Sequence, residues 1–163
     1  MTVLGIDPGL ANIGWGVIDS KDQKFHLIDY GHLTTKAHTP VEDRIQRIGK
    51  ECSNLLDTHK IDALGIEDIF YFQNKSSAIS VAKVIGAIYY VASLHEVPVF
   101  SYSPLQIKTS ITGFGRADKK QVQEMVKILL GLPKIPKPDH AADALATAIC
   151  HCTQSLAKER IGI

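Results

Sequence analysis

The hydrophobic period of this chain changes once, near residue 39, and that change limits the folds open to it. Before it, apolar residues gather in three short segments, 3–7, 13–18 and 25–33, whose short connecting turns predict an antiparallel meander. After it, helical patterns alternate with further strands at 61–67 and 97–102. The sequence therefore predicts an α/β fold with a mixed five-stranded sheet, three antiparallel strands followed by parallel strands, and helices on both faces.

Local signals indicate where the helices begin. Thr39-Pro40-Val41-Glu42 predicts a capping box with proline at the first helical position, and apolar residues then recur at helical spacing to residue 56. The other expected helices are a long apolar one over 75–95, a short one capped by Ser103, one capped by Asp118, and an alanine-rich one from about Asp139 to Ser155. We expect a single domain over 1–155 and a C-terminal tail over 156–163.

The composition excludes several classes of protein. A chain of 163 residues with 45% hydrophobic and 21% charged residues is typical of one soluble globular domain and not of a disordered chain. No apolar run reaches the ~18 residues of a membrane span, and the first residues lack the basic region of a signal peptide. These observations predict a cytoplasmic protein.

The three cysteines, Cys52, Cys150 and Cys152, raise the question of zinc. Structural zinc sites usually need two pairs of ligands, and no second pair exists here. Buried free thiols are the better interpretation because Cys52 and Cys152 fall on apolar helix phases.

Charge is unevenly distributed along the chain. Residues 71–138 carry nine basic and three acidic side chains, whereas the segments on either side are acidic on balance. This pattern is typical of a protein that holds phosphates in one place and metal ions in another, although ordinary surface variation is the alternative.

Two strands end in a lone acid after an apolar run: Asp7 follows Val-Leu-Gly-Ile, and Glu67 follows Ala-Leu-Gly-Ile. His140 and Asp143, spaced i, i+3, share one face of the last helix. If these side chains converge, their mutual repulsion calls for a cation, and carboxylate-rich sites favour Mg²⁺ or Mn²⁺ over zinc. The alternatives are a turn cap for Asp7, a basic partner for Glu67, and an N-cap role for Asp139.

Four motifs carry a resemblance over essentially the whole chain: IDPG at 6–9, IED at 66–68 with Phe70 following, TGFGRADKKQVQ at 112–123, and DHAADALATAI at 139–149. In this order they resemble the RuvC resolvases, endonucleases of the ribonuclease H-like superfamily that cut four-way Holliday junctions. The resemblance implies that Asp7, Glu67, His140 and Asp143 are a catalytic tetrad that binds two Mg²⁺ ions, with Mn²⁺ as a substitute. Many relatives have Asp at the position of His140, and an imidazole there predicts relatively greater activity in Mn²⁺.

The resemblance also implies DNA contacts. It places Lys108 and Lys119 near the scissile phosphate as catalytic lysines and Phe70 on a base at the crossover. We expect further DNA contacts from basic residues near the glycine-rich turn at 113–115 and beyond the second acid, namely Lys75, Arg116 and Lys120. Tyr71 and Phe72 serve either DNA or an interface, and Lys83 and Lys127 are expected to be solvated surface.

The implied activity is resolution of Holliday junctions in homologous recombination and DNA repair, leaving 5′-phosphate and 3′-hydroxyl ends, alongside the RuvA–RuvB branch-migration complex. Two cuts related by symmetry call for a homodimer, and the apolar helix 75–95 is a natural interface unless it is buried within one chain. Two other functions stay open here. One is a ribonuclease H-like nuclease for hybrids or flaps, and the other is an actin-like ATP-binding module, although 163 residues supply only one of its two lobes.

Overall fold

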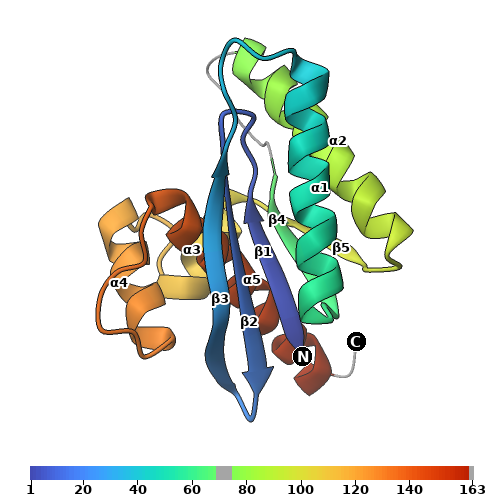
Figure 1. The fold of residues 1–163 in the computed structure, drawn as a ribbon. Helices are drawn as coiled ribbons and strands as arrows, with labels where there is room; N and C mark the ends of the chain where they lie inside the picture. The colour runs from blue at the N-terminus through green and yellow to red at the C-terminus, as the bar shows by residue number, and fades with distance from the viewer. Residues whose placement is uncertain (69–74, 162–163) are drawn as a thin grey trace.

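Strands and helices follow one another along the chain in the order that the sequence predicts (Figure 1). The computed structural model describes residues 1–68 and 75–161, with the side chains of 75–76 and 158–161 left out. The strands are β1 (Thr2–Asp7), β2 (Asn12–Lys21), β3 (Lys24–Thr34), β4 (Ala63–Glu67) and β5 (Val99–Tyr102). The helices are α1 (Val41–His59), α2 (Lys75–Leu94), α3 (Pro104–Thr112), α4 (Lys119–Leu129) and α5 (Asp139–Ile161). The last helix thus continues beyond its predicted end at Ser155.

The sheet has the strand order β3-β2-β1-β4-β5. β1 pairs with β2 and β2 with β3 in antiparallel fashion, whereas β1 with β4 and β4 with β5 are parallel, which confirms the predicted mixed sheet. The register pairs Val3 with Ala63 and Ile6 with Ile66. Because β1 and β4 run in parallel and in register, Asp7 and Glu67 end at the same edge of the sheet.

Helices cover both faces of the sheet (Figure 1). α1 and α2 lie on one face over a core that includes Leu4, Val17 and Leu64. α5 lies on the other face, backed by α3 and α4, over a core that includes Val3 and Ile18. Consecutive residues of β1 therefore belong to opposite cores, as the two-residue period of a strand requires.

A row of glycines lets α5 lie directly on the sheet. Gly5 pairs with Gly16 on β2 and with Gly65 on β4, so three strands lack side chains along one line. A Cβ at Gly5 would overlap the carbonyl oxygen of Ala144, and one at Gly16 would meet the side chain of Leu145. The alanine-rich face of α5 completes this close approach, because a larger side chain on either partner would push the helix outward.

The helix starts show one wrong prediction and two confirmed ones. α1 begins at Val41 with Pro40 at the N-cap and no side-chain cap hydrogen bond, so the capping box predicted for Thr39 and Glu42 does not form. Pro40 has no side-chain acceptor, and the first-turn N–H groups belong to exposed residues, where water can accept from them. The predicted caps Ser103 and Asp118 do accept hydrogen bonds, from the backbone N–H groups of Gln106 and Gln121.

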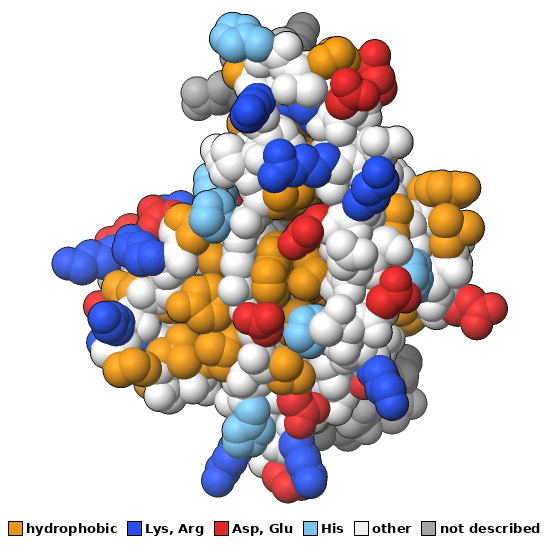
Figure 2. Space-filling view, in the orientation of Figure 1, with side chains coloured by type: hydrophobic (Ala, Val, Ile, Leu, Met, Phe, Trp, Pro, Cys, Tyr) orange, Lys and Arg blue, Asp and Glu red, His pale blue; other side chains and the backbone are white. Residues whose placement is uncertain are grey.

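α2 presents apolar residues on two sides. Val84, Ile88 and Ala92 are fully buried, whereas Tyr90 and Leu94 are 67% and 65% exposed. Apolar side chains gather over the C-terminal end of this helix at the right of Figure 2. By length and composition alone, the segment Ser77–Leu94 could cross a membrane, although Lys83 and three serines interrupt its apolar residues.

The cysteine prediction is confirmed. Cys52, Cys150 and Cys152 are all buried and free. Burial raises the pKa of Cys52 and of Cys152 to about 12, which keeps both as neutral thiols.

Candidate active site

Strand alternation sends two acids to the face that α5 covers. Gly5 and Gly65 both face α5, since a Cβ on either would meet atoms of that helix. Asp7 and Glu67 stand two residues further along β1 and β4, on the same side of the pleat. Each acid is the last residue of its strand, where the sheet gives way to open space.

The first turn of α5 brings the other two predicted residues to this edge. His140 Nδ1 lies 2.7 Å from Asp7 Oδ2. Because a carboxylate oxygen only accepts, the ring donates from Nδ1. The ligand atoms of Asp7, His140 and Asp143 lie within 4.8 Å of one another, so three members of the predicted tetrad converge.

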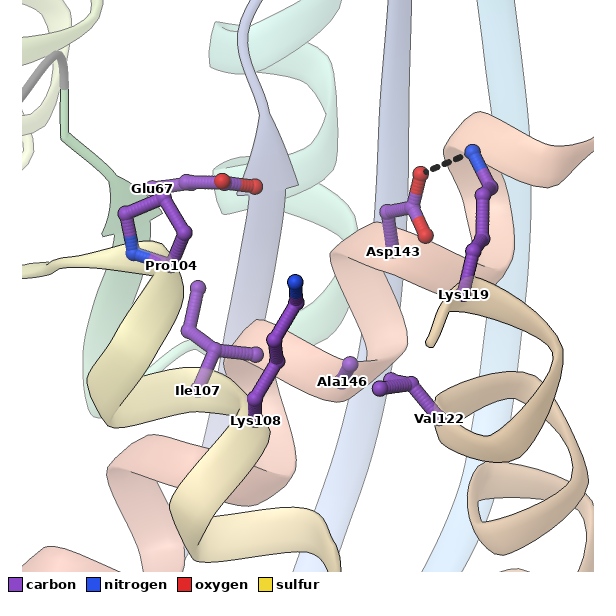
Figure 3. A pocket seen from close by; sticks show the side chains of 8 residues that line it. All are labelled: Glu67, Pro104, Ile107, Lys108, Lys119, Val122, Asp143 and Ala146. Atoms are coloured by element: carbon purple, nitrogen blue, oxygen red, sulfur yellow. Dashed lines mark hydrogen bonds and ion pairs between the residues drawn. The ribbon is translucent and has the colours of Figure 1, made fainter. Parts of the chain in front are cut away.

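Glu67 lies outside this tight group and faces it across a cavity of about 270 Å³. Figure 3 shows its carboxylate pointing into the opening from β4, with Asp143 on the opposite side and Lys108 rising between them. The cavity is lined by Glu67, Pro104, Ile107, Lys108, Lys119, Val122, Asp143 and Ala146. It is therefore a concave site with an apolar floor and charged walls.

The pKa values of two carboxyl groups in the site are raised. Burial, reinforced by the negative charges of Asp7 and Asp143, raises the pKa of Glu67 to about 7. Burial likewise raises the pKa of Asp7, and the hydrogen bond from His140 offsets only part of that rise. A carboxyl group with a raised pKa gains from a nearby cation, so these shifts mark the site as one that would bind a cation well.

Two lysines supply the positive charge that the site has. Lys119 donates to Asp143 Oδ2 at 2.8 Å and lies 3.7 Å from Asp139 Oδ2. Burial lowers the pKa of Lys119, but the hydrogen bond and the charges of Asp143 and Asp139 raise it overall. Lys108 reaches into the same cavity from α3 (Figure 3).

Asp139 begins α5, and its carboxylate is bound by lysine rather than turned toward the metal-ligand group. Lys137 donates to Asp139 Oδ1 at 2.7 Å and lowers the pKa of that carboxyl. The nearby Gln123 amide lowers it further, although Nε2 of this buried side chain has no partner within hydrogen-bonding distance among the described residues. The described metal-ligand group does not include Asp139, as expected, but the predicted N-cap role is wrong, because Asp139 is the first residue of α5 and its carboxylate pairs with Lys137.

The predicted DNA contacts lie partly outside the described residues. Arg116, Lys119 and Lys120 are exposed at the start of α4, close to the cavity. Phe70, Tyr71 and Phe72 lie in the undescribed segment 69–74, and Lys75 is described by its backbone alone, at the start of α2. Of the two lysines expected at the surface, Lys83 is exposed and Lys127 pairs with Glu124 at 3.1 Å.

Sequence reasoning missed the glycines that position the site. A Cβ at Gly14 would overlap the carbonyl group of His140, so this residue admits the first turn of α5. The signal was present, because Gly5 and Gly65 each stand two residues before an acid, and Gly14 and Gly16 alternate on the next strand. It also missed Lys137 and Gln123 as neighbours of Asp139, which no local pattern indicates.

Acids lie at the ends of β1 and β4, and α5 places two further candidate metal ligands opposite them. Together with the strand order, this arrangement defines a nuclease of the ribonuclease H-like class. The profile of the family described as crossover junction endodeoxyribonuclease RuvC matches residues 3–151. The chain therefore belongs to the RuvC family.

Individual relatives agree with this assignment. A crossover junction endodeoxyribonuclease RuvC of Clostridioides difficile is 46% identical over 151 residues, which cover 93% of this chain and 89% of the relative. A RuvC of Thermus thermophilus, solved in complex with a Holliday junction substrate, superposes with a TM-score of 0.91 at 34% identity, covering 95% of this chain and 94% of the other. The yeast mitochondrial Holliday junction resolvase Ydc2 shares the fold at 14% identity and a TM-score of 0.72.

The residues present fit a divalent metal ion. Three carboxylates supply hard oxygen donors and His140 adds one softer nitrogen, a set that suits Mg²⁺ or Mn²⁺. Burial and, less strongly, the neighbouring acids raise the pKa of Asp7 and of Glu67, so a bound cation would favour the charged form of both groups. A candidate acidic metal site on a RuvC fold indicates divalent-metal dependence.

Proposed function

We propose that this chain resolves Holliday junctions by hydrolysing one phosphodiester bond on each of two symmetrically placed strands of four-way DNA. The observation that carries the proposal is the convergence of Asp7, His140 and Asp143 at one edge of the sheet, across a cavity from Glu67. The same fold carries a Holliday junction in the Thermus thermophilus relative. The products would be 5′-phosphate and 3′-hydroxyl ends, formed in homologous recombination and DNA repair.

Asp7, Glu67, His140 and Asp143 would hold two Mg²⁺ ions, with Mn²⁺ as a substitute. Bound there, the ions would lower the pKa of the attacking water and neutralise charge on the leaving 3′ oxygen. The Asp7–His140 hydrogen bond would hold the imidazole in a fixed orientation within the ligand group. The roles of these four residues follow from their geometry and from the family motif together.

Lys108 and Lys119 would contact the scissile phosphate. Both line the cavity, and Lys108 rises between the two acidic walls (Figure 3). A lysine there neutralises charge that develops on the non-bridging oxygens. Arg116 and Lys120, exposed beside the cavity, would hold the adjoining strand, as would Lys75, and Phe70 would stack on a base at the crossover.

The proposed enzyme is a homodimer that joins through α2. A two-fold junction cut on two strands needs two active sites in fixed relation. Ile79, Tyr90 and Leu94 are 60%, 67% and 65% exposed on one face of α2 and form an apolar stripe that the exposed Lys83 interrupts. Enzymes that act on DNA are soluble, and we place this one in the cytoplasm, where it would act with the RuvA–RuvB complex.

The test uses a synthetic four-way junction and two conservative variants. Asp7→Asn should bind the junction with Ca²⁺ in a gel-shift assay and fail to cut it in Mg²⁺ or Mn²⁺. Asp22→Asn is the matched control, because Asp22 lies in the exposed turn between β2 and β3, at the far end of the sheet, with φ 52°. Asparagine tolerates that conformation, so this variant should bind and cut like the wild type. Cleavage by Asp7→Asn would refute the assigned site.

A further inference from the structure

Lys119 pairs with Asp143, which is also one of the proposed metal ligands. Its Nζ lies 2.8 Å from Asp143 Oδ2, and Asp143 belongs to the group of three converging ligands. Metal ions of this class bind carboxylate oxygen at ~2.1 Å. An ammonium group and a divalent ion on the same oxygen repel each other, so an ion at Asp143 Oδ2 would weaken the Lys119 contact and favour movement of Lys119 away from that oxygen.

Asp139 is placed to receive Lys119. Its Oδ2 lies 3.7 Å from the same Nζ, so a shift of about 1 Å would form a charge-assisted hydrogen bond. Asp139 lies outside the described ligand group, and Lys137 holds its other oxygen at 2.7 Å. One oxygen of its carboxylate is thus paired with a second lysine, and the other faces Lys119.

A buried amide donor lies beside the carboxylate of Asp139. Gln123 is only 6% exposed, its amide is a neighbour of Asp139, and its Nε2 has no hydrogen-bond partner among the described side chains. A buried donor without a partner is costly, and a carboxylate that shifts slightly would satisfy it.

We propose that Lys119 competes with divalent ions for Asp143 and that Asp139 is its second partner, a positioning residue that keeps Lys119 beside the scissile phosphate once Asp143 binds metal. This inference rests on the proposed function. Lys119 would then link metal binding to phosphate contact, because it becomes available to the substrate as Asp143 takes up an ion.

The first experiment measures Mn²⁺ affinity without DNA, by electron paramagnetic resonance of protein stripped with a chelator. Lys119→Met should bind Mn²⁺ about tenfold more tightly than the wild type. Lys108→Met is the matched control, because Lys108 lines the same cavity and makes no ion pair among the described residues. Its effect should stay below about threefold, since it changes only the longer-range charge. Lys119→Arg keeps the charge and should stay near the wild type.

The second experiment asks whether Asp139 receives the displaced lysine. Asp139→Asn should weaken Mn²⁺ binding while Lys119 is present, because the lysine then has no second partner. In the Lys119→Met background the same change should have a smaller effect, and the two single changes should not add. Additive effects would remove Asp139 from the proposal. Tighter Mn²⁺ binding by Asp139→Asn would mean that Asp139 holds Lys119 against Asp143, which also contradicts it.

These measurements separate the inference from the function on which it rests. Equal effects of Lys119→Met and Lys108→Met on Mn²⁺ affinity would overturn the competition and leave the nuclease proposal intact. The absence of any Mn²⁺ binding by the wild type and by all variants would overturn both.

Discussion

Gly14 lies directly beneath His140, so close that a methyl group on Gly14 would overlap the carbonyl oxygen of His140. Gly14 is also the pairing partner of Asp7 across β1 and β2. The missing side chain of Gly14 therefore allows His140 to lie next to Asp7, because the first turn of α5 can pack directly on β2 at this point. The His140–Asp7 hydrogen bond depends on that approach.

Gly14→Ala should reduce the cleavage activity strongly and the stability of the fold only moderately. The added methyl group would push the start of α5 outward, with a loss of unfolding free energy of about 1–3 kcal/mol. Cleavage should fall about a hundredfold, since a displacement near 1 Å misplaces the ligands. Gly49→Ala is the control, because its Cβ would meet Val91 at an ordinary 3.6 Å. Equal cleavage by the two variants, measured on a four-way junction, would contradict the positioning role of Gly14.

The stability of chelator-treated protein should fall as the pH rises from about 4.5 to about 7. The pKa of Glu67 is raised from 4.5 to about 7 by burial and by Asp7 and Asp143. The folded state then holds this proton more tightly than the unfolded state, so its contribution is complete below pH 4.5 and is lost by about pH 7. The loss is at most about 3 kcal/mol, and urea unfolding across this pH range measures it.

Glu67→Gln should flatten that part of the stability profile, because the amide does not titrate. Glu124→Gln, on α4 and paired with Lys127, should keep the wild-type slope. Added Mg²⁺ should restore stability above pH 7 in the wild type more than in Glu67→Gln. A slope that is unchanged in Glu67→Gln would show that other groups cause the pH dependence.

His140 should set the preference between metal ions. Its imidazole donates to Asp7 through Nδ1 and would offer a nitrogen ligand, which favours Mn²⁺ relative to Mg²⁺. His140→Asp replaces that nitrogen with a carboxylate oxygen and should lower the ratio of the Mn²⁺ to the Mg²⁺ cleavage rate several-fold. Initial rates across a titration of each ion measure the ratio. Wild-type rates in Mg²⁺ that equal or exceed those in Mn²⁺ would refute the preference.

Tyr90→Glu on α2 should dissociate the proposed dimer. Tyr90 is 67% exposed on the apolar stripe, and a buried carboxylate there would lack a partner. Sedimentation velocity at micromolar concentration should show a dimer for the wild type and a monomer for the variant. Ile128→Glu is the control, since Ile128 is 63% exposed on α4 and should leave the dimer intact. A monomeric wild type would refute the dimer itself.

Much of the fold was predictable because local patterns decide it. The two-residue period of β1 and β4 determines which face each acid takes, and the i, i+3 spacing puts His140 and Asp143 on one side of a helix. Local reasoning failed at Thr39, where the residues matched a capping box but Pro40, not Thr39, occupies the N-cap position. The predicted end of α5 near Ser155 was too early, because no breaker follows that residue and the helix continues to Ile161.

By itself, the sequence determined the order of the elements, the positions of the acids at strand ends and the identity of the ligand-bearing helix, because period, turns and caps act over a few residues. Only the tertiary structure decided which groups meet: His140 with Asp7, 133 residues apart, and Lys119 with both Asp143 and Asp139. Such distances follow from strand register and from how closely α5 packs on the glycine row. Register and packing depend on many contacts between residues far apart in the sequence, so no local pattern predicts these distances.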